Sequence, residues 1–416
     1  MPLCAVVGYT WRRYGGYSSV AERRSVAADV VGSKPTSRPN HPLFPFCVRP
    51  VSMETLSNQR ASALPQSLSP ENSLPNSLAR EGFAVTPFVP RRWLANGHLQ
   101  TIVGNLLSRK DRLPHYSTEL VEVSPATHNQ ISSQVLCQCH WQPEAVRRER
   151  LTVILVHGLE GSSQSQYVVG NANKMFAAGL NVIRMNMRNC GGTESLTPTL
   201  YHSGLSCDVK CVMEYAIRRY GLERVALVGY SMGGNLVLKL AGELGDSQPK
   251  LRGVVGVSPA LDLGPSADAL HLAENRLYER RFRKALLKRF RRKVMLFPRC
   301  FDPRQADGVE SLRDFDERIT ALYSGFSSAT DYYYRASAGR VIEKIAVPTL
   351  VLNALDDPFI RVTEESDAKL RANPNVTYLE TEHGGHCAFL ESADKASGYD
   401  GYWAERTLLR FLLMQE

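Results

Sequence analysis

A serine flanked by glycines is the residue best placed for nucleophilic chemistry. Residues 225–228 form a short apolar run typical of a buried parallel strand, and the next five residues, Gly229-Tyr-Ser-Met-Gly233, match Gly-x-Ser-x-Gly. Helical spacing then returns, which indicates a strand, a sharp turn and a helix. A Cβ at either glycine would collide with the neighbouring helix or strand. The pattern predicts that Ser231 is an exposed nucleophile, and the alternative is a chance match in which Ser231 only caps the helix.

A serine hydroxyl needs a histidine to accept its proton and a carboxylate to orient that histidine. After such a turn the order along the chain is serine, acid, histidine, each at the end of a strand. Asp357 directly precedes Pro-Phe-Ile and is the favoured acid, with Asp356 as a turn or N-cap residue. His386 follows Gly-Gly and precedes a small residue, so it is favoured over His383. Asp356 and His383 remain open alternatives, as does a purely structural role for both loops.

The tetrahedral intermediate of acyl transfer requires N–H donors for its oxyanion. The backbone N–H groups of Met232, after the nucleophile, and of Leu159, after a predicted strand, are the expected pair. His157 is expected to shape the turn before Leu159, and Glu160 to be a loop or gating side chain without assigned chemistry. The histidines lack metal-ligand spacing and His-Glu-x-x-His is absent, so we predict neither a metal nor a cofactor.

Alternating strands and helices are expected to position these residues. Two β-segments, residues 118–123 and 134–141, are predicted to be antiparallel edge strands. Further strands are predicted at residues 152–156, 181–187, 225–228, 253–258, 349–353 and 376–380, with helices between them and a final amphipathic helix at 402–414. This order predicts a doubly wound, mostly parallel sheet with its ligand site at the carboxyl ends of the strands.

The motifs together resemble the α/β-hydrolase superfamily and, within it, the AB-hydrolase type-4 or YheT-like family, over roughly residues 83–414. The specific pieces are Asn96-Gly-His-Leu-Gln-Thr101, His157-Gly-Leu-Glu-Gly-Ser162, Asn186-Met-Arg-Asn-Cys-Gly-Gly192, Gly229-Tyr-Ser-Met-Gly-Gly-Asn235, Asp356-Asp-Pro-Phe359 and His383-Gly-Gly-His386. The resemblance implies the α/β-hydrolase fold and a serine carboxylesterase or lipase-like enzyme, with Ser231, Asp357 and His386 as its triad. Cys387-Ala388 departs from the family pattern, a change expected to tighten the histidine loop without removing the base.

One α/β-hydrolase domain is predicted for residues 83–416, preceded by an arm and by an extension at residues 1–82 that is disordered or spurious. Residues 16–40 resemble the conceptual translation of a transfer-RNA gene, which would place the true start at Met53; a transit peptide is the other alternative. Residues 1–52 hold seven Lys or Arg and two acidic residues, so they carry +5 of the net charge of +9. The basic balance therefore does not indicate nucleic-acid binding.

The cysteines and the hydropathy pattern bear on the compartment. Nine cysteines without Cys-x-x-Cys spacing indicate reduced core residues, and no stretch reaches about 18 apolar residues. We expect a cytoplasmic protein, and peripheral contact with membranes is a second, additional expectation.

A long insertion at about residues 262–343 is predicted to form a helical lid over the site. Residues 276–299 contain eleven Lys or Arg and one acid, and an apolar stripe recurs at four-residue spacing in Phe282, Leu286, Phe290 and Val294. This helix would contact anionic membranes, or it would cover the substrate pocket while its charges are solvated. Residues 331–334 would line an acyl channel or serve packing alone.

The predicted activity is hydrolysis of short-to-medium acyl esters or monoacylglycerol-like lipids through an acyl-enzyme on Ser231. An acyltransferase using the same triad and a non-catalytic lipid- or ligand-binding protein on the same fold are the alternatives. The acyl chain, the alcohol and the oligomeric state are not encoded in any pattern we identify.

Overall fold

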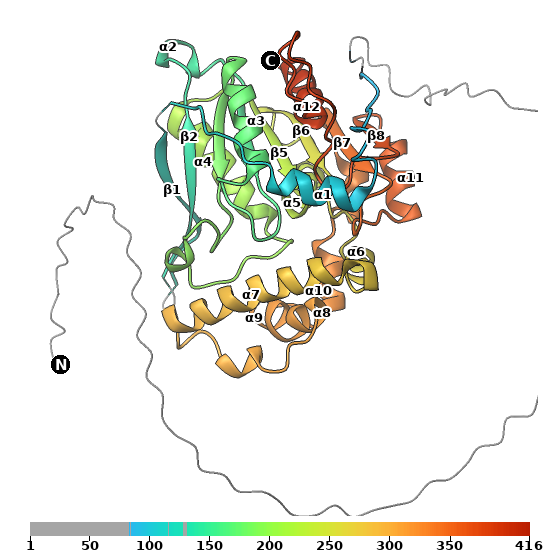
Figure 1. The fold of residues 1–416 in the computed structure, drawn as a ribbon. Helices are drawn as coiled ribbons and strands as arrows, with labels where there is room; N and C mark the ends of the chain where they lie inside the picture. Colours follow the sequence, from blue (N-terminus) through green and yellow to red (C-terminus); the bar gives the residue numbers. More distant parts are fainter. Residues whose placement is uncertain (1–82, 84, 115, 128–130) are drawn as a thin grey trace, which may run out of the picture. The chain divides into compact units, whose positions relative to one another are not determined.

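A twisted sheet runs through the part of the chain that the computed structural model describes, residues 83, 85–114, 116–127 and 131–416 (Figure 1). The extension predicted at residues 1–82 lies outside the described residues. The sheet has eight strands in the order β1-β2-β4-β3-β5-β6-β7-β8. Their bounds are β1 Ser117–Ser124, β2 Ser133–His140, β3 Thr152–Val156, β4 Asn181–Met185, β5 Val225–Tyr230, β6 Leu251–Val257, β7 Thr349–Ala354 and β8 Val376–Thr381.

The strand directions agree with the sequence. β1 pairs antiparallel with β2, and β2 pairs antiparallel with β4, whereas the strands from β4 to β8 are parallel. The predicted α/β class with an antiparallel edge is therefore confirmed. β4 ends at Met185, two residues earlier than predicted, because the N–H of Met187 donates to Nε2 of His157 at 3.1 Å and leaves the ladder.

Helices cover both faces of the sheet, which explains why its parallel strands are almost continuously apolar. The helices outside the later insertion are α1 Gly97–Leu106, α2 Glu144–Arg147, α3 Gln166–Ala177, α4 Ser206–Tyr220, α5 Met232–Leu244, α11 Glu364–Ala372 and α12 Trp403–Leu413. One apolar core includes residues of α4 and α5, and the core on the other face includes residues of α3 and α12. The final amphipathic helix is confirmed, with Trp403, Leu408 and Phe411 buried.

The N-terminal arm packs on the domain as expected, through Phe88 against Trp403 and through a 2.7 Å hydrogen bond from the indole N–H of Trp403 to the carbonyl of Thr86. The sequence did not predict that residues 97–106 form a helix. Asn96 begins α1 by accepting a hydrogen bond from the N–H of Leu99 on its side chain.

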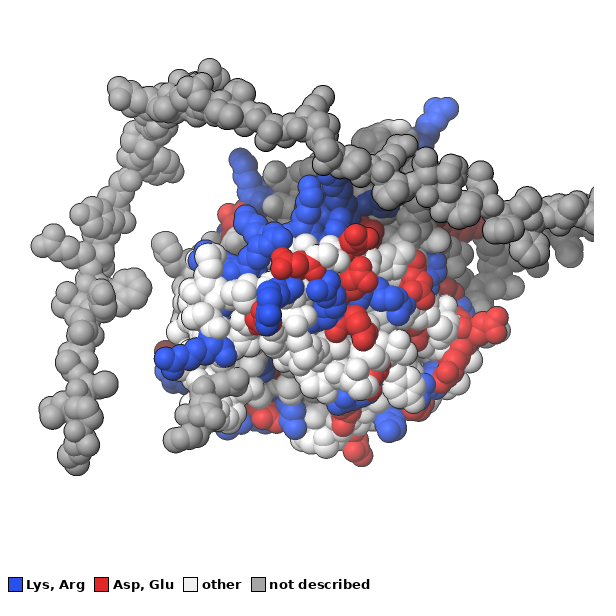
Figure 2. Space-filling view, turned by 90° about the horizontal axis from the view of Figure 1, so that it is seen from below, with Lys and Arg blue, Asp and Glu red and all other residues white. Residues whose placement is uncertain are grey.

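Between β6 and β7 the chain forms a helical insertion, called the lid segment below (residues 262–343), which lies beyond one end of the sheet (Figure 1). It contains α6 Leu263–Leu270, α7 Arg276–Leu296, α8 Leu312–Phe315, α9 Leu322–Ser324 and α10 Ala329–Ala336. Viewed from this side, Lys and Arg gather over part of the surface with acidic side chains beside them (Figure 2).

Two cations of α7 differ from the expectation of a solvated charged face. Lys293 is 0% exposed and donates to the carbonyls of Glu194 and Thr197, and Arg289 is 13% exposed in ion pairs with Glu160 and Glu194. The apolar stripe was correctly placed, because Leu286 and Phe290 are buried. Spacing alone could not predict which charged residues between the stripe residues are buried, since the partners of Lys293 and Arg289 lie on distant loops.

Two smaller findings concern the described residues only. None of their helices is both long and apolar enough to cross a membrane. Their seven cysteines are all free, and three of them, Cys137, Cys139 and Cys190, are buried.

Candidate active site

Ser231 stands where β5 ends and α5 begins, with a positive φ of 54°. A Cβ at Gly229 would approach the carbonyl oxygen of Gly233 to 2.1 Å, and one at Gly233 would approach the carbonyl oxygens of Val156 and His157 to 2.4 Å. Both glycines are therefore required by close backbone contact, as the motif predicted. A serine held in this strained turn is typical of a nucleophile, and Ser231 lines two cavities.

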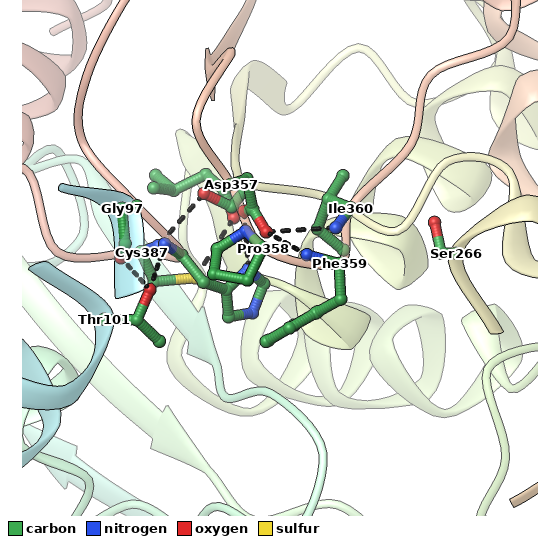
Figure 3. Close-up of polar contacts among 12 residues, drawn as sticks. Gly97, Thr101, Ser266, Asp357, Pro358, Phe359, Ile360 and Cys387 are labelled. Atoms are coloured by element: carbon green, nitrogen blue, oxygen red, sulfur yellow. Dashed lines mark hydrogen bonds and ion pairs between the residues drawn. The ribbon is translucent and has the colours of Figure 1, made fainter. Parts of the chain in front are cut away.

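His386 and Asp357 meet after β8 and β7 respectively. Nδ1 of His386 lies 2.8 Å from Oδ2 of Asp357, and the Asp357 side chain is almost fully buried. The other oxygen of Asp357 accepts hydrogen bonds from the N–H groups of Phe359 at 3.1 Å and Ile360 at 3.0 Å (Figure 3). These bonds fix the carboxylate. Because Nδ1 of His386 faces Asp357, the other ring nitrogen, Nε2, is left for another partner. His386 and Ser231 line the same cavity.

Electrostatics in this pair favour the protonated imidazole. Burial lowers the pKa of His386. The Asp357 carboxylate and the hydrogen bond to it raise that pKa by more, so the resulting pKa lies well above the ordinary value of 6.5. An imidazolium stabilised in this way is what a base needs when it takes a proton from a serine.

Asp356 and His383, the open alternatives, lie in the same two loops with a different task. Oδ1 of Asp356 accepts a hydrogen bond from the N–H of Gly385 at 2.8 Å, and Oδ2 lies 3.5 Å from Nδ1 of His383. Asp356 therefore lies in a turn, as one of its two predicted roles required, and it connects the loop of Asp357 to the loop of His386. His383 is not among the residues that line either cavity containing Ser231.

The α1 helix supports the loops that carry Asp357 and His386, a role that sequence reasoning missed. The hydroxyl of Thr101 donates to the carbonyl of Gly97 at 2.7 Å and accepts from the N–H of His386 at 2.8 Å (Figure 3). The side chain of Gln100 exchanges hydrogen bonds with the backbone N–H and C=O of Leu390. The distinctive run from Asn96 to Thr101 was the available signal, but nothing in it indicates a partner some 285 residues away.

The residues that carry the expected oxyanion donors share a cavity with the serine. Leu159 and Met232 line the same cavity as Ser231. Among the described residues, neither backbone N–H donates a hydrogen bond, whereas the neighbouring N–H of Gly158 donates to the hydroxyl of Tyr167 at 2.8 Å. Two unpaired donors at a nucleophile are suited to an oxyanion.

His157 shapes the turn that presents Leu159. Its ring is fully buried, Nδ1 lies 2.8 Å from the carbonyl oxygen of Gly158, and Nε2 accepts from the N–H of Met187. Burial lowers its pKa to about 4, so the ring is neutral and serves as a spacer between the ends of β3 and β4.

Two cavities of different character meet at Ser231. The first, of about 120 Å³, has a mostly apolar lining, to which the lid segment contributes Phe282, Leu286, Phe315 and Tyr333, among others. The second, of about 520 Å³, is more polar and extends past His386 along α1. Tyr332 and Tyr333 of the predicted 331–334 channel line the first cavity, whereas Tyr334 is exposed.

The parallel sheet, the strained serine between β5 and α5, and the buried acid–histidine pair at neighbouring strand ends together define an α/β hydrolase. The comparisons with known proteins agree. Residues 152–393 match the family model described as alpha/beta hydrolase fold. YheT of Escherichia coli (strain K12) is 30% identical over 75% of this chain and 89% of its own length.

More distant relatives carry more specific names. Phospholipase ABHD3 of Bos taurus is 27% identical over 73% of each chain. Medium-chain fatty acid ethyl ester synthase/esterase 2 of Saccharomyces cerevisiae (strain ATCC 204508 / S288c) is 26% identical over 62% of this chain and 61% of its own. The chain belongs to the α/β-hydrolase family and, within it, to the YheT-like proteins that the sequence motifs indicated.

Proposed function

We propose that this protein cleaves carboxylic esters through an acyl-enzyme on Ser231, with His386 as base and Asp357 as the acid that orients it. Relatives named as an esterase, a phospholipase and an ester synthase/esterase support ester hydrolysis. The observation that carries the residue assignment is the buried 2.8 Å contact between His386 and Asp357 beside a serine at positive φ.

In the proposed reaction Oγ of Ser231 attacks the ester carbonyl carbon while Nε2 of His386 takes its proton. The N–H groups of Leu159 and Met232 stabilise the oxyanion, and Asp357 stabilises the imidazolium. The imidazolium then returns the proton to the leaving alcohol, and an acyl-enzyme remains. Water attacks the acyl carbon with His386 again as base, and the carboxylic acid is released.

The two cavities support a division of the substrate. We assign the acyl chain to the apolar cavity under the lid segment and the alcohol part to the larger, more polar cavity. An apolar cavity of only about 120 Å³ favours short-to-medium acyl chains over long ones. The relatives named as a phospholipase and as a medium-chain ester synthase/esterase are consistent with lipid-like esters.

A fluorophosphonate probe and a panel of p-nitrophenyl and glycerol esters of increasing chain length test this function. Wild-type protein should be labelled and should hydrolyse the esters, and Ser231→Ala should lose both labelling and roughly a million-fold in kcat. Equal labelling of the alanine variant would favour a non-catalytic binding protein. Turnover that appears only when an alcohol is added as acceptor would identify an acyltransferase.

Membrane contact is a second part of the proposal. The outer face of α7 exposes Arg276, Arg280, Arg281, Lys284, Lys288 and Arg291. Beside it, α1 exposes Leu99, Ile102 and Leu106, the last 71% exposed, and His98 of α1 stacks on Tyr278 of α7. Ile102, Leu106 and Arg281 line the larger cavity, so its wall joins the basic and apolar surfaces.

This surface is suited to an anionic lipid headgroup layer, from which an amphiphilic ester would enter. Co-sedimentation should detect binding to phosphatidylcholine vesicles that contain phosphatidylserine, with loss of binding at high salt and in a Lys284→Glu, Lys288→Glu variant. Equal binding to vesicles of phosphatidylcholine alone would contradict the electrostatic argument.

A further inference from the structure

Glu160 immediately follows Leu159, the residue that carries one proposed oxyanion donor. It adopts a positive φ of 57°, which is strained for a residue with a side chain. Strained backbone persists only where its surroundings hold it in place. The contacts of the Glu160 side chain therefore bear on the direction of the neighbouring N–H.

Those contacts come from a helix of the lid segment. Nε and Nη2 of Arg289, on α7, donate to the two carboxylate oxygens of Glu160 at 2.8 and 3.0 Å. The hydroxyl of Tyr201 donates to the same carboxylate at 2.6 Å and accepts from the N–H of Glu160 at 3.3 Å. Glu160 is 14% exposed and Arg289 13% exposed, so water screens this pair only weakly.

Arg289 also binds the loop after β4. It donates to the carbonyl of Asn189 and to the carboxylate of Glu194, the latter at 3.3 Å. A single guanidinium thus joins the turn after β3, the loop after β4 and helix α7. The same helix contributes Phe282 and Leu286 to the roof of the apolar cavity.

We propose that Arg289 is a positioning residue that holds Glu160, and through it the Leu159 N–H, in the geometry an oxyanion requires, so that the contact of α7 with the turn after β3 supports the oxyanion hole. This inference rests on the proposed function. Glu160 and Arg289 influence the reaction only through the Leu159 N–H, because neither touches the reacting atoms.

Lys293 provides a matched control on the same helix. It is buried and donates to the carbonyls of Glu194 and Thr197, so it attaches α7 to the loop after β4 without contacting Glu160. Lys293→Met should loosen α7 about as much as Arg289→Met does, but it leaves the Glu160 carboxylate paired. Any difference in kinetics or affinity between the two variants then reflects the turn that carries Leu159 and not the attachment of α7.

The experiment compares wild type, Arg289→Met, Arg289→Lys, Glu160→Gln and Lys293→Met in the full chain. We measure kcat and KM on a p-nitrophenyl ester, and the affinity for an alkyl boronic acid, which occupies the oxyanion hole, and for the product carboxylate. Arg289→Met should lose about 100-fold in kcat and in boronate affinity, and less than threefold in carboxylate affinity. Arg289→Lys should recover part of the loss, and Lys293→Met should keep the ratio of the two affinities near wild type.

Parallel losses in Arg289→Met and Lys293→Met, or unchanged boronate affinity in Arg289→Met, would overturn the inference. If Arg289→Met does not fold, Glu160→Gln decides the question, because it keeps the shape of the side chain while removing its charge. Failure of the proposed function looks different, since the wild-type protein itself would then neither hydrolyse the esters nor react with the fluorophosphonate.

Discussion

The loops at the strand ends and the lid segment are held by different kinds of interaction. The loops that carry Asp357 and His386 are short and follow parallel strands, and their backbone N–H groups donate to the side chains of Asp357, Asp356 and Thr101. The lid segment packs apolar side chains into the core, and the long side chains of Arg289 and Lys293 bind the loops after β3 and β4. The two regions meet at the loop of Asp357, where the side chain of Asn275 donates to the carbonyl of Pro358 at 2.7 Å, and at the turn that carries Leu159, where Arg289 binds Glu160.

The largest effect that tests this contrast is expected at the acid. Asp357→Asn should lower kcat/KM by about 10⁴-fold, because an amide neither stabilises the imidazolium nor holds the required tautomer. Asp356→Asn should change it less than about threefold, since an amide oxygen still accepts from the N–H of Gly385. Steady-state kinetics on one ester distinguishes the two, and the reverse ranking would make Asp356 the acid.

A smaller effect is expected where α1 supports the loops from outside. In Gly97→Ala the new Cβ would lie 1.9 Å from the carbonyl oxygen of Asp356, so helix and acid loop must separate. A displacement of about 1 Å at the histidine costs roughly 100-fold in kcat/KM. The matched control is Gly264→Ala in the lid segment, whose Cβ meets nothing within 4 Å and which should leave the kinetics unchanged. Equal activity of the two variants would show that α1 does not position the base.

The smallest effect concerns pH. His386 must be neutral to act as base, and its pKa is raised, so activity should be low in acid and rise with pH along a limb centred well above the ordinary histidine pKa of 6.5. In Asp357→Asn the residual activity should show the limb at lower pH, because the charge that raised the pKa is gone. Lys293→Met should leave the limb in place, and a shift there would mean that the lid segment also sets the base.

The features that were predicted correctly from the sequence are mostly local patterns. Apolar runs located six parallel strands, and the glycines around Ser231 indicated a turn whose backbone leaves no room for a Cβ. The helix at residues 97–106 was missed. Its apolar side chains Leu99, Ile102 and Leu106 remain exposed, so its pattern does not point to a buried core face.

By itself the sequence determined the order of the elements, the sheet edge at which the polar loops gather and the short set of candidate residues, because strand periodicity and close-packed glycines are local requirements. Only the tertiary structure decided that Asp357 and not Asp356 contacts His386, that Thr101 holds the histidine loop, and that Arg289 contacts Glu160. Those contacts join residues as much as 285 positions apart, and hydrogen-bond geometry between such residues depends on ångström-scale placement that no spacing along the chain encodes.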